Sequence, residues 1–399
     1  MPSYRNSDPV PPIMRGSPPQ LVVPRADWDR PPWNRWAFQH VRELLPTVEV
    51  WRGEGPVQEL PRATRDLDAL AVPQVGGGQG SLAALLDATY TDGFIVLKQG
   101  AIVYERYFNG MGPRSLHLSQ SVAKTVVGAV AGILVGQRLL DPEAPVIRYL
   151  PELAATGWRD AKLRHVLDMT SGTRFGEAYT DPYSDIGQVD VASGWKPVPA
   201  EADPAFRWPG HIWELILGLK EAIRPHGERF EYRSIETDVL AFCMERVTGR
   251  RLAQLVSEEL WQKMGAEASA CFTVDPAGYA LADGGFNATL RDYARFGQLW
   301  IAGEVLPAEW IADSRRRNGA SFPAEAEASL PGGAYRNMIW NADPKGDVLL
   351  ARGVFGQLIY LDFRHEMVAV KLSSWPDFLD RPRDAATRAA LAEIARTLA

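Results

Sequence analysis

The sequence has little cysteine, with only Cys243 and Cys271 among its 399 residues. The two do not form a CxxC pair, and neither lies near a histidine at the spacing of a metal site. This excludes a disulfide framework, because such frameworks need several cysteines in a short chain. One bridge between the two stays open, although two buried free thiols in a reducing compartment are the simpler interpretation.

The sequence also lacks a long hydrophobic run. No uncharged and predominantly apolar stretch reaches about 18 residues, the length a helix needs to cross a bilayer. The apolar stretch Val126–Gly136 is too short, and residues 1–36 are rich in proline and charge, unlike a signal peptide. We therefore expect a cytoplasmic protein that makes no contact with a membrane.

An excess of basic charge is absent as well. The 43 basic and 49 acidic side chains give a net charge of −6, and no basic stripe with interleaved aromatic residues occurs. Nucleic acid is therefore not an expected partner. The glycine-rich segment Val75–Gly80 is not followed by GK[ST], which argues against a nucleotide-binding phosphate loop.

Two hydrolase signatures are missing. The six histidines form no HExxH pattern, and the chain has no GxSxG nucleophile elbow. These absences argue against a zinc protease and against a Ser-His-Asp hydrolase. We expect a protein that needs no metal and no cofactor.

What the sequence does have is material for a core and a clear order of elements. Apolar residues make up 46% of the chain, enough for one large unit. Residues 1–75, with four tryptophans, predict an irregular arm packed on the body, and residues 76–399 predict a single unit. A hairpin over Gly93–Phe108 and strands over Gly346–Ser374 flank a mainly helical region, roughly residues 140–300.

This order predicts an α+β fold, an α/β sandwich with a central antiparallel sheet. The hairpin and the late strands would share that sheet, helices would flank it, and the helical region would form an inserted lobe. A cleft between the sheet and the lobe is the expected place for a site.

The stretch LHLSQSVAKTVVGAVAGILVG places Ser121 and Lys124 in the first turn of an apolar helix. Residues three apart share a helix face, with Cβ atoms about 5–6 Å apart. Serine becomes a nucleophile when a base takes its proton, and burial lowers the pKa of a lysine toward that task. The alternative is a helix capped by Ser119 or Ser121, with Lys124 reaching water.

Two distant segments favour the nucleophile. Tyr232-Arg233-Ser234 lies just before a predicted helix, and Arg352-Gly353-Val354 lies on a late strand. In this order the three segments resemble the SxxK, YxN and KTG motifs of the serine β-lactamase and penicillin-binding-protein superfamily. The likeness implies a β-lactamase-like fold.

Further segments narrow the resemblance to the 6-aminohexanoate-dimer hydrolases, which are nylon-oligomer hydrolases on the carboxylesterase branch of the class C β-lactamase fold. The similarity runs from about residue 80 to the end. It rests on GEAYTDPYSDIGQVDVASGW, FEYRSIETDVLAF, RDYARFGQLW, GVFGQ and VAVKLSSWPD.

The resemblance implies three catalytic residues. Ser121 matches the nucleophile, Lys124 matches its partner base, and Tyr232 matches the tyrosine that relays a proton to the leaving group. Ser121 would then attack a carbonyl, form an acyl-enzyme and be released by water.

The resemblance also implies substrate-binding residues. Tyr179 matches a tyrosine that contacts the leaving amide nitrogen, and Asp190 matches a carboxylate that pairs with the terminal ammonium of the substrate. The backbone N–H groups of Ser121 and of Val354 or Phe355 would form the oxyanion hole.

Departures from the family motifs affect the expected substrate. Ser234 replaces the asparagine of YxN, Arg352 and Val354 replace the lysine and threonine of KTG, and no histidine lies near Phe355. Recognition of a β-lactam carboxylate is therefore less secure.

The sequence predicts a serine hydrolase of short linear amides or esters, 6-aminohexanoate-dimer-type substrates included. The alternatives are a carboxylesterase, a D-aminopeptidase or a β-lactamase on the same site, or a non-catalytic penicillin-binding-like module. The expected partner is a small-molecule amide or ester, and a homodimer is possible.

Overall fold

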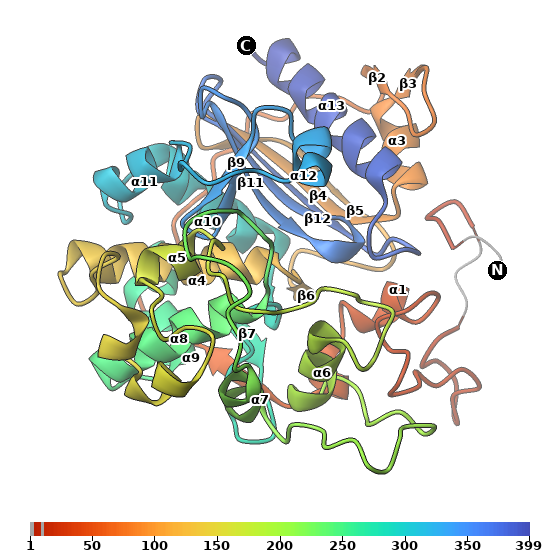
Figure 1. Cartoon of the computed structure of the whole chain (residues 1–399). Helices are drawn as coiled ribbons and strands as arrows, with labels where there is room; N and C mark the ends of the chain where they lie inside the picture. Colours follow the sequence, from red (N-terminus) through yellow and green to blue (C-terminus); the bar gives the residue numbers. More distant parts are fainter. Residues whose placement is uncertain (1–3, 9–11) are drawn as a thin grey trace.

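A seven-stranded antiparallel sheet forms the centre of the computed structural model, which describes residues 4–8 and 12–399 (Figure 1). Each strand pairs antiparallel with its neighbours. In sheet order the strands are β5 (Ala101–Tyr107), β4 (Thr91–Lys98), β13 (Met367–Ser373), β12 (Gln357–Asp362), β11 (Val348–Gly353), β10 (Ile339–Asn341) and β9 (Ala334–Arg336).

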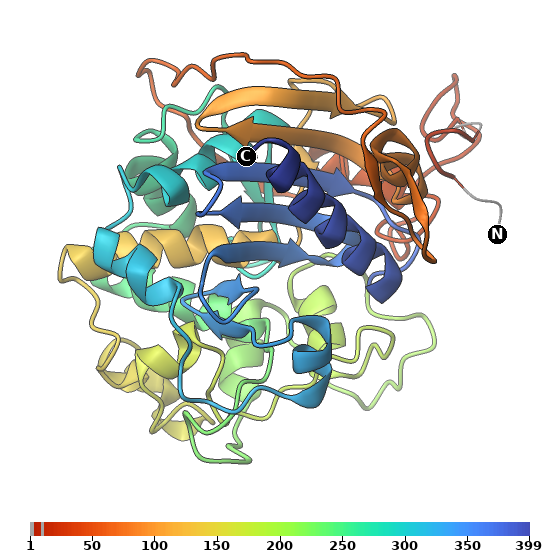
Figure 2. The ribbon, with the colours of Figure 1, turned by 90° about the horizontal axis from the view of Figure 1, so that it is seen from above.

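Helices cover both faces of this sheet because the side chains of its strands alternate between two apolar cores. In β13, Met367 and Ala369 face one core, whereas Val368 and Val370 face the other. The first core is closed by α3 (Leu82–Ala88) and α13 (Arg381–Thr397), and Figure 2 shows α13 crossing over the strands. The second is closed by α4 (Val122–Gly136) and α10 (Leu290–Ala302).

The predicted hairpin is confirmed as β4 and β5, joined at Gln99 and Gly100. Both turn residues have positive φ, 50° and 76°. That is the backbone of a type I′ turn, whose twist matches the twist of the flanking strands. The hairpin and the late strands do share one sheet, so the predicted fold class is confirmed.

The mainly helical region forms a lobe beside α4. Its longest helix, α8 (Ile235–Thr248), ends at Gly249, whose φ of 67° suits a glycine C-cap. The shorter helices are α5 (Leu163–Leu167), α6 (Asp185–Ala192), α7 (Ile212–Gly218) and α9 (Leu252–Val256), with 3₁₀ turns at Val146–Arg148 and Pro151–Ala155 and a π-helical turn at Ser257–Trp261.

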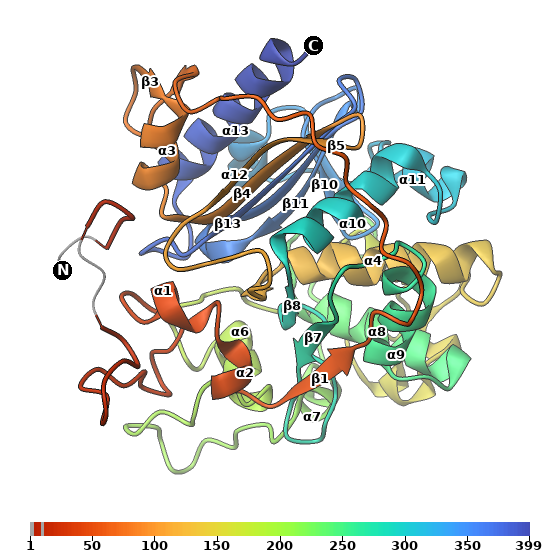
Figure 3. The same cartoon turned by 180° about the vertical axis from the view of Figure 1, so that it is seen from behind.

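Four further strands form a second, smaller sheet. Its order is β1 (Thr47–Val50), β7 (Ala270–Thr273), β8 (Phe286–Ala288) and β6 (His117–Leu118). Figure 3 shows β1 beside β7, so this sheet joins the N-terminal segment to the lobe.

The first 75 residues are more ordered than the predicted irregular arm. Besides β1 they contain α1 (Asn34–Ala37), α2 (Val41–Leu44) and β2 (Ala71–Pro73), which pairs with β3 (Gln79–Ser81). Strand β1 forms because it pairs with β7. Since β7 lies more than 200 residues further along the chain, local sequence patterns do not reveal this pairing.

Trp28 links this segment to the lobe through buried contacts with Trp195. Its side chain is fully buried, and its indole N–H donates to the carbonyl of Trp195 at 2.9 Å. The two indole rings meet edge to face with centroids 5.2 Å apart. The segment is therefore part of the core and not a free tail.

Trp28→Ala is expected to lower the free energy of unfolding by about 3–5 kcal/mol, because it removes a large buried ring and leaves a cavity. Urea denaturation of the whole protein measures the loss. Trp51→Ala is the matched control, since Trp51 is 47% exposed, and it should change stability by less than about 0.5 kcal/mol. Equal stability of both variants would contradict this packing role.

The remaining helices, α11 (Ala308–Ser314) and α12 (Ala324–Ser329), lie near the β9 end of the sheet (Figure 1). Both cysteines are free and buried, as the sequence predicts. Within residues 4–8 and 12–399, none of the helices combines the length and apolar character required for a bilayer crossing.

Candidate active site

Ser121 lies at the N-terminal end of α4, directly after β6 and a tight turn. The turn residue Gln120 has a φ of 50°, a left-handed conformation that non-glycine residues rarely adopt. The Ser121 side chain makes no capping hydrogen bond, and the Ser119 hydroxyl donates to the Phe286 carbonyl at 3.0 Å. The capping alternative is therefore wrong for both serines, and the Ser121 hydroxyl is not used to cap the helix.

Lys124 points back at Ser121 and does not reach water. Its ammonium donates to the Ser121 hydroxyl at 2.9 Å and to the Asp283 carbonyl at 2.6 Å. The residue is only 1% exposed, because the surrounding residues of α4 are buried in the core. The predicted spacing thus produces a direct Ser–Lys contact.

The pKa of Lys124 is raised, which corrects the expectation that burial would lower it. Burial does lower it, but electrostatic interactions with the ionisable side chains of Tyr232, Asp283 and Glu177 together outweigh that effect. An ammonium surrounded by these groups holds its proton. These neighbours therefore favour the charged form of Lys124, so Lys124 needs a partner to take up the serine proton.

Tyr232 supplies such a partner. It precedes α8, stacks on Trp340 with ring centroids 5.6 Å apart, and places its ring 5.2 Å from the Lys124 ammonium. Its hydroxyl is hydrogen-bonded to Ser121 and Lys124. Burial raises the pKa of Tyr232, whereas the positive charge of Lys124 opposes that rise. The three predicted catalytic side chains therefore meet in one place.

The end of β11 approaches the start of α4 closely, and Gly353 makes this approach possible. A Cβ atom on Gly353 would lie 2.5 Å from the carbonyl oxygen of Ser119, which is a clash. The next residue, Val354, therefore lies beside Ser121, and both line the same cavities.

The two residues predicted for the second oxyanion-hole donor differ. The Phe355 N–H donates to the Phe378 carbonyl at 2.9 Å, so it is already occupied. Phe355 also has a φ of 62°, and its ring packs on the ring of Phe38, with centroids 5.3 Å apart. This leaves the N–H of Val354 as the candidate donor, together with that of Ser121.

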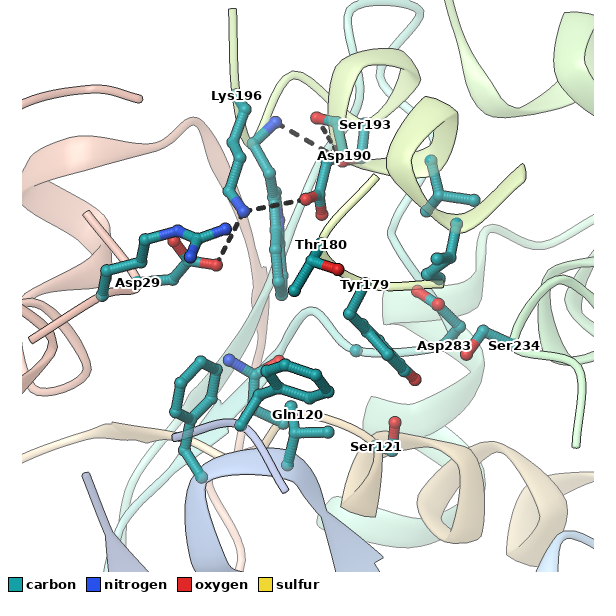
Figure 4. A pocket seen from close by; sticks show the side chains of 18 of the residues that line it. Asp29, Gln120, Ser121, Tyr179, Thr180, Asp190, Ser193, Lys196, Ser234 and Asp283 are labelled. Carbon is teal, nitrogen blue, oxygen red and sulfur yellow. Dashed lines mark hydrogen bonds and ion pairs between the residues drawn. The ribbon is translucent and has the colours of Figure 1, made fainter. Parts of the chain in front are cut away.

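Two cavities open on either side of Ser121, one of about 230 Å³ and one of about 470 Å³. We call them the small cavity and the large cavity. The small cavity lies between α6, the N-terminal segment and the start of α4 (Figure 4). Tyr179 and Val354 line both, so the Ser121 hydroxyl lies where the two cavities join.

Tyr179, which the sequence resemblance predicts to bind the substrate, lies at this junction. Its ring packs on Phe378 with centroids 5.2 Å apart, and its hydroxyl is hydrogen-bonded to Glu177. Figure 4 shows the hydroxyl groups of Tyr179 and Ser121 facing the same space. Burial and the nearby Glu177 carboxylate raise the pKa of Tyr179 well above its usual value, so it remains a proton donor.

Asp190 also lines the small cavity, but its carboxylate is already paired. The Lys196 ammonium contacts the carboxylates of Asp190 and Asp29, each at 2.9 Å. Burial raises the pKa of Asp190 to about 6, with Lys196 opposing the rise. The predicted ammonium partner of the substrate therefore shares its charge with a lysine of the same chain.

Three acidic residues of the site are not found by sequence reasoning. Glu177 accepts hydrogen bonds from the N–H and the hydroxyl of Ser234 at 2.5 and 3.3 Å. Asp283 approaches the Lys124 ammonium to 4.0 Å, and Asp29 pairs with Lys196. Only Glu177, two residues before Tyr179, carries a sequence signal; the other two come from distant segments.

Comparison with known proteins places most of the chain in a defined family. A family model described as Beta-lactamase matches residues 82–394. A curated relative, the 6-aminohexanoate-dimer hydrolase of Paenarthrobacter ureafaciens, is 35% identical over 358 residues, which is 88% of each chain.

Solved structures give the same picture. A candidate 6-aminohexanoate-dimer hydrolase from Bacillus anthracis is 30% identical and has a TM-score of 0.84, covering 94% of this chain and 97% of its own. EstCE1, a hydrolase with promiscuous acyltransferase activity, shares the fold at 17% identity, with a TM-score of 0.58 over 76% of this chain and 98% of its own.

Proposed function

The chain belongs to the beta-lactamase family, whose members are serine hydrolases, and on that premise we propose that Ser121 is the nucleophile with which it hydrolyses amides or esters. One observation supports this assignment above the others. The Lys124 ammonium contacts the Ser121 hydroxyl at 2.9 Å in a buried site that also holds the Tyr232 hydroxyl. A serine acts as a nucleophile when such groups accept its proton.

Acylation follows from this geometry. The reactive form of the Lys124–Tyr232 pair carries one proton fewer than an ammonium beside a phenol, so it can act as a base. The Ser121 oxygen forms a bond to the substrate carbonyl carbon while its proton passes to this pair. The N–H groups of Ser121 and Val354 stabilise the negative charge on the carbonyl oxygen. The bond to the leaving nitrogen or oxygen then breaks, and Tyr232 returns a proton to the leaving group.

Deacylation uses the same groups in reverse. A water molecule gives a proton to the Lys124–Tyr232 pair and attacks the acyl carbon. The bond between that carbon and the Ser121 oxygen breaks, and the serine regains the proton. The products are a carboxylic acid and an amine or an alcohol.

The two cavities suggest a linear substrate that crosses Ser121. The curated relative is named for the 6-aminohexanoate dimer, a linear amide, so short alkanoyl amides are the starting substrate class. By the resemblance of Asp190, the acyl half would lie in the small cavity. The leaving half would then extend into the large cavity, whose lining carries charges of both signs, among them Arg229, Arg381 and Glu325.

A β-lactam is a weaker candidate for this site. The strand position that carries a lysine in the β-lactamase motif holds Arg352, which pairs with Asp384 at 3.1 Å and lies over Trp340 at 5.4 Å. Its charge is therefore already neutralised beside the serine. Ester hydrolysis is the second candidate, because the same groups act with a better leaving group.

Tyr179→Phe is expected to lower kcat/KM for an anilide about 10²-fold and for the matching 4-nitrophenyl ester less than about threefold. An amine leaves poorly without a proton, and the Tyr179 hydroxyl would orient the leaving nitrogen to receive the proton of Tyr232. Positioned proton transfer typically contributes about 10²–10⁴-fold, whereas nitrophenolate leaves unaided. Initial rates on butyryl anilide and butyryl ester measure the difference. Equal losses on both substrates would remove this role.

Intact-protein mass spectrometry with a fluorophosphonate tests the proposed function directly. The expected result is one adduct per chain, located on Ser121 by peptide mapping. An unlabelled Ser121 in folded protein that also fails to turn over nitrophenyl esters would support the non-catalytic module instead.

The proposal also covers the cell compartment, the binding partner and the oligomeric state of the enzyme. Two free buried cysteines suit a reducing cytoplasm. The partner is a small-molecule amide or ester, and a homodimer is the proposed assembly, which light scattering of the full chain measures.

A further inference from the structure

Lys196 lies inside the small cavity with a carboxylate on each side (Figure 4). Its ammonium contacts Asp190 at 2.9 Å, from α6, and Asp29 at 2.9 Å, from the N-terminal segment. The Lys196 and Asp190 side chains are 18% and 28% exposed, so this ion pair borders the space that a substrate would fill.

The position of Lys196 matters because of what Asp190 would otherwise bind. A substrate ammonium in contact with the Asp190 carboxylate would lie close to the Lys196 ammonium. Two like charges at such a distance repel each other strongly where burial reduces the screening by water. The lysine therefore competes with the substrate for the same carboxylate.

An acyl chain that ends in a carboxylate fits no better. The charged residues of the lining are four carboxylates and two cations, so the cavity is formally negative on balance and repels a carboxylate. They are Asp29, Asp190, Asp283, Asp377, Arg30 and Lys196. Much of the remaining lining is apolar. It includes Pro31, Ile186, Val189, Trp195, Leu281 and Phe355.

We propose that Lys196 determines the acyl specificity of this hydrolase, by occupying the partner position of Asp190 so that the small cavity accepts acyl chains with an uncharged end. This rests on the proposed function and narrows its substrate class. The favoured substrates are amides and esters of uncharged aliphatic acids, and amino-terminated acyl chains are disfavoured.

The wild-type enzyme tests this with two substrates that share a leaving group, the 4-nitroanilides of hexanoic acid and of 6-aminohexanoic acid. At about pH 8 the terminal amine of the second chain is charged. The expected result is a kcat/KM at least about tenfold higher for the hexanoyl chain, a difference of about 1.4 kcal/mol. A preference for the 6-aminohexanoyl chain would overturn the proposal.

Lys196→Met is expected to shift the ratio of the two kcat/KM values at least about tenfold toward the 6-aminohexanoyl chain, because Asp190 becomes free to bind its ammonium. Adding Asp190→Asn to this variant should abolish the shift. Lys263→Met is the matched control, since it removes an ion-paired lysine, 2.7 Å from Glu259, that lines neither cavity. Its ratio should equal that of the wild type.

An unchanged ratio in Lys196→Met would also overturn the proposal. Removal of the lysine leaves two neighbouring carboxylates unpaired and so lowers stability. If this variant does not fold, the proposal is tested by the ratio of the two kcat/KM values in Lys196→Gln and in the wild type. Glutamine keeps a hydrogen-bond donor without the charge. Failure of the wild type on both anilides and on nitrophenyl esters contradicts the proposed function itself, which separates the two outcomes.

Discussion

Ser121→Ala is expected to lower kcat for nitrophenyl esters and anilides about 10⁴-fold or more, down to the residual rate that substrate binding and the oxyanion hole provide. The hydroxyl is the group that bonds to the acyl carbon, and no neighbouring group replaces it. Spectrophotometric turnover of both substrate types measures the effect. It should be accompanied by complete loss of fluorophosphonate labelling.

The loss should not come from unfolding. Since the Ser121 side chain makes no capping hydrogen bond, alanine removes no interaction that α4 needs. The urea midpoint should therefore match that of the wild type. Ser115→Ala, in the segment just before β6 and outside both cavities, is the matched control and should keep full activity. Residual turnover of Ser121→Ala near the wild-type rate would move the nucleophile elsewhere.

Lys124→Met is expected to have the second largest effect, a loss of kcat of about 10²–10⁴-fold on esters and anilides alike. Without the ammonium, the Ser121 hydroxyl loses its hydrogen-bond donor, and Tyr232 loses the positive charge that opposes the rise of its pKa. Lys124→Arg should not restore the rate, because the larger planar guanidinium cannot occupy the same buried position. Single-turnover kinetics should show that acylation, and not product release, has slowed.

A second buried lysine provides the control for this change. Lys371 is also 1% exposed, but it lies on β13, and its ammonium donates to the Thr89 carbonyl and the Ser373 hydroxyl. Lys371→Met should therefore keep most of the activity. If the two lysine variants lost activity equally and in parallel with stability, Lys124 would have only a structural role.

Sequence reasoning predicts the parts of the fold and of the site that depend on residues close together in the chain. Alternating apolar residues and the Gln99-Gly100 turn specify the hairpin, and helical spacing with Gly249 specifies the end of α8. The contact between Ser121 and Lys124 follows from helix geometry alone. The meeting of these two residues with Tyr232 followed from the family resemblance, since no local rule joins segments so far apart.

The parts that sequence reasoning misses depend on distant contacts. Strand β1 forms on a partner more than 200 residues away, and the charge on Lys124 is set by acids from three other segments. The occupied N–H of Phe355 depends on Phe378, which lies after β13 and is separated from Phe355 by two strands. In each case the deciding neighbour lies beyond the window in which periodicity and propensity act.

The position of Asp29 has a consequence for sorting relatives by sequence. The family model begins at residue 82, so it contains Ser121, Lys124 and Lys196 but not the carboxylate that holds Lys196 from the other side. Two homologues could align perfectly across that region and still discriminate differently between acyl chains. Substrate preference in this branch could thus drift through an N-terminal segment that alignments of the shared domain discard, while the reaction itself is preserved.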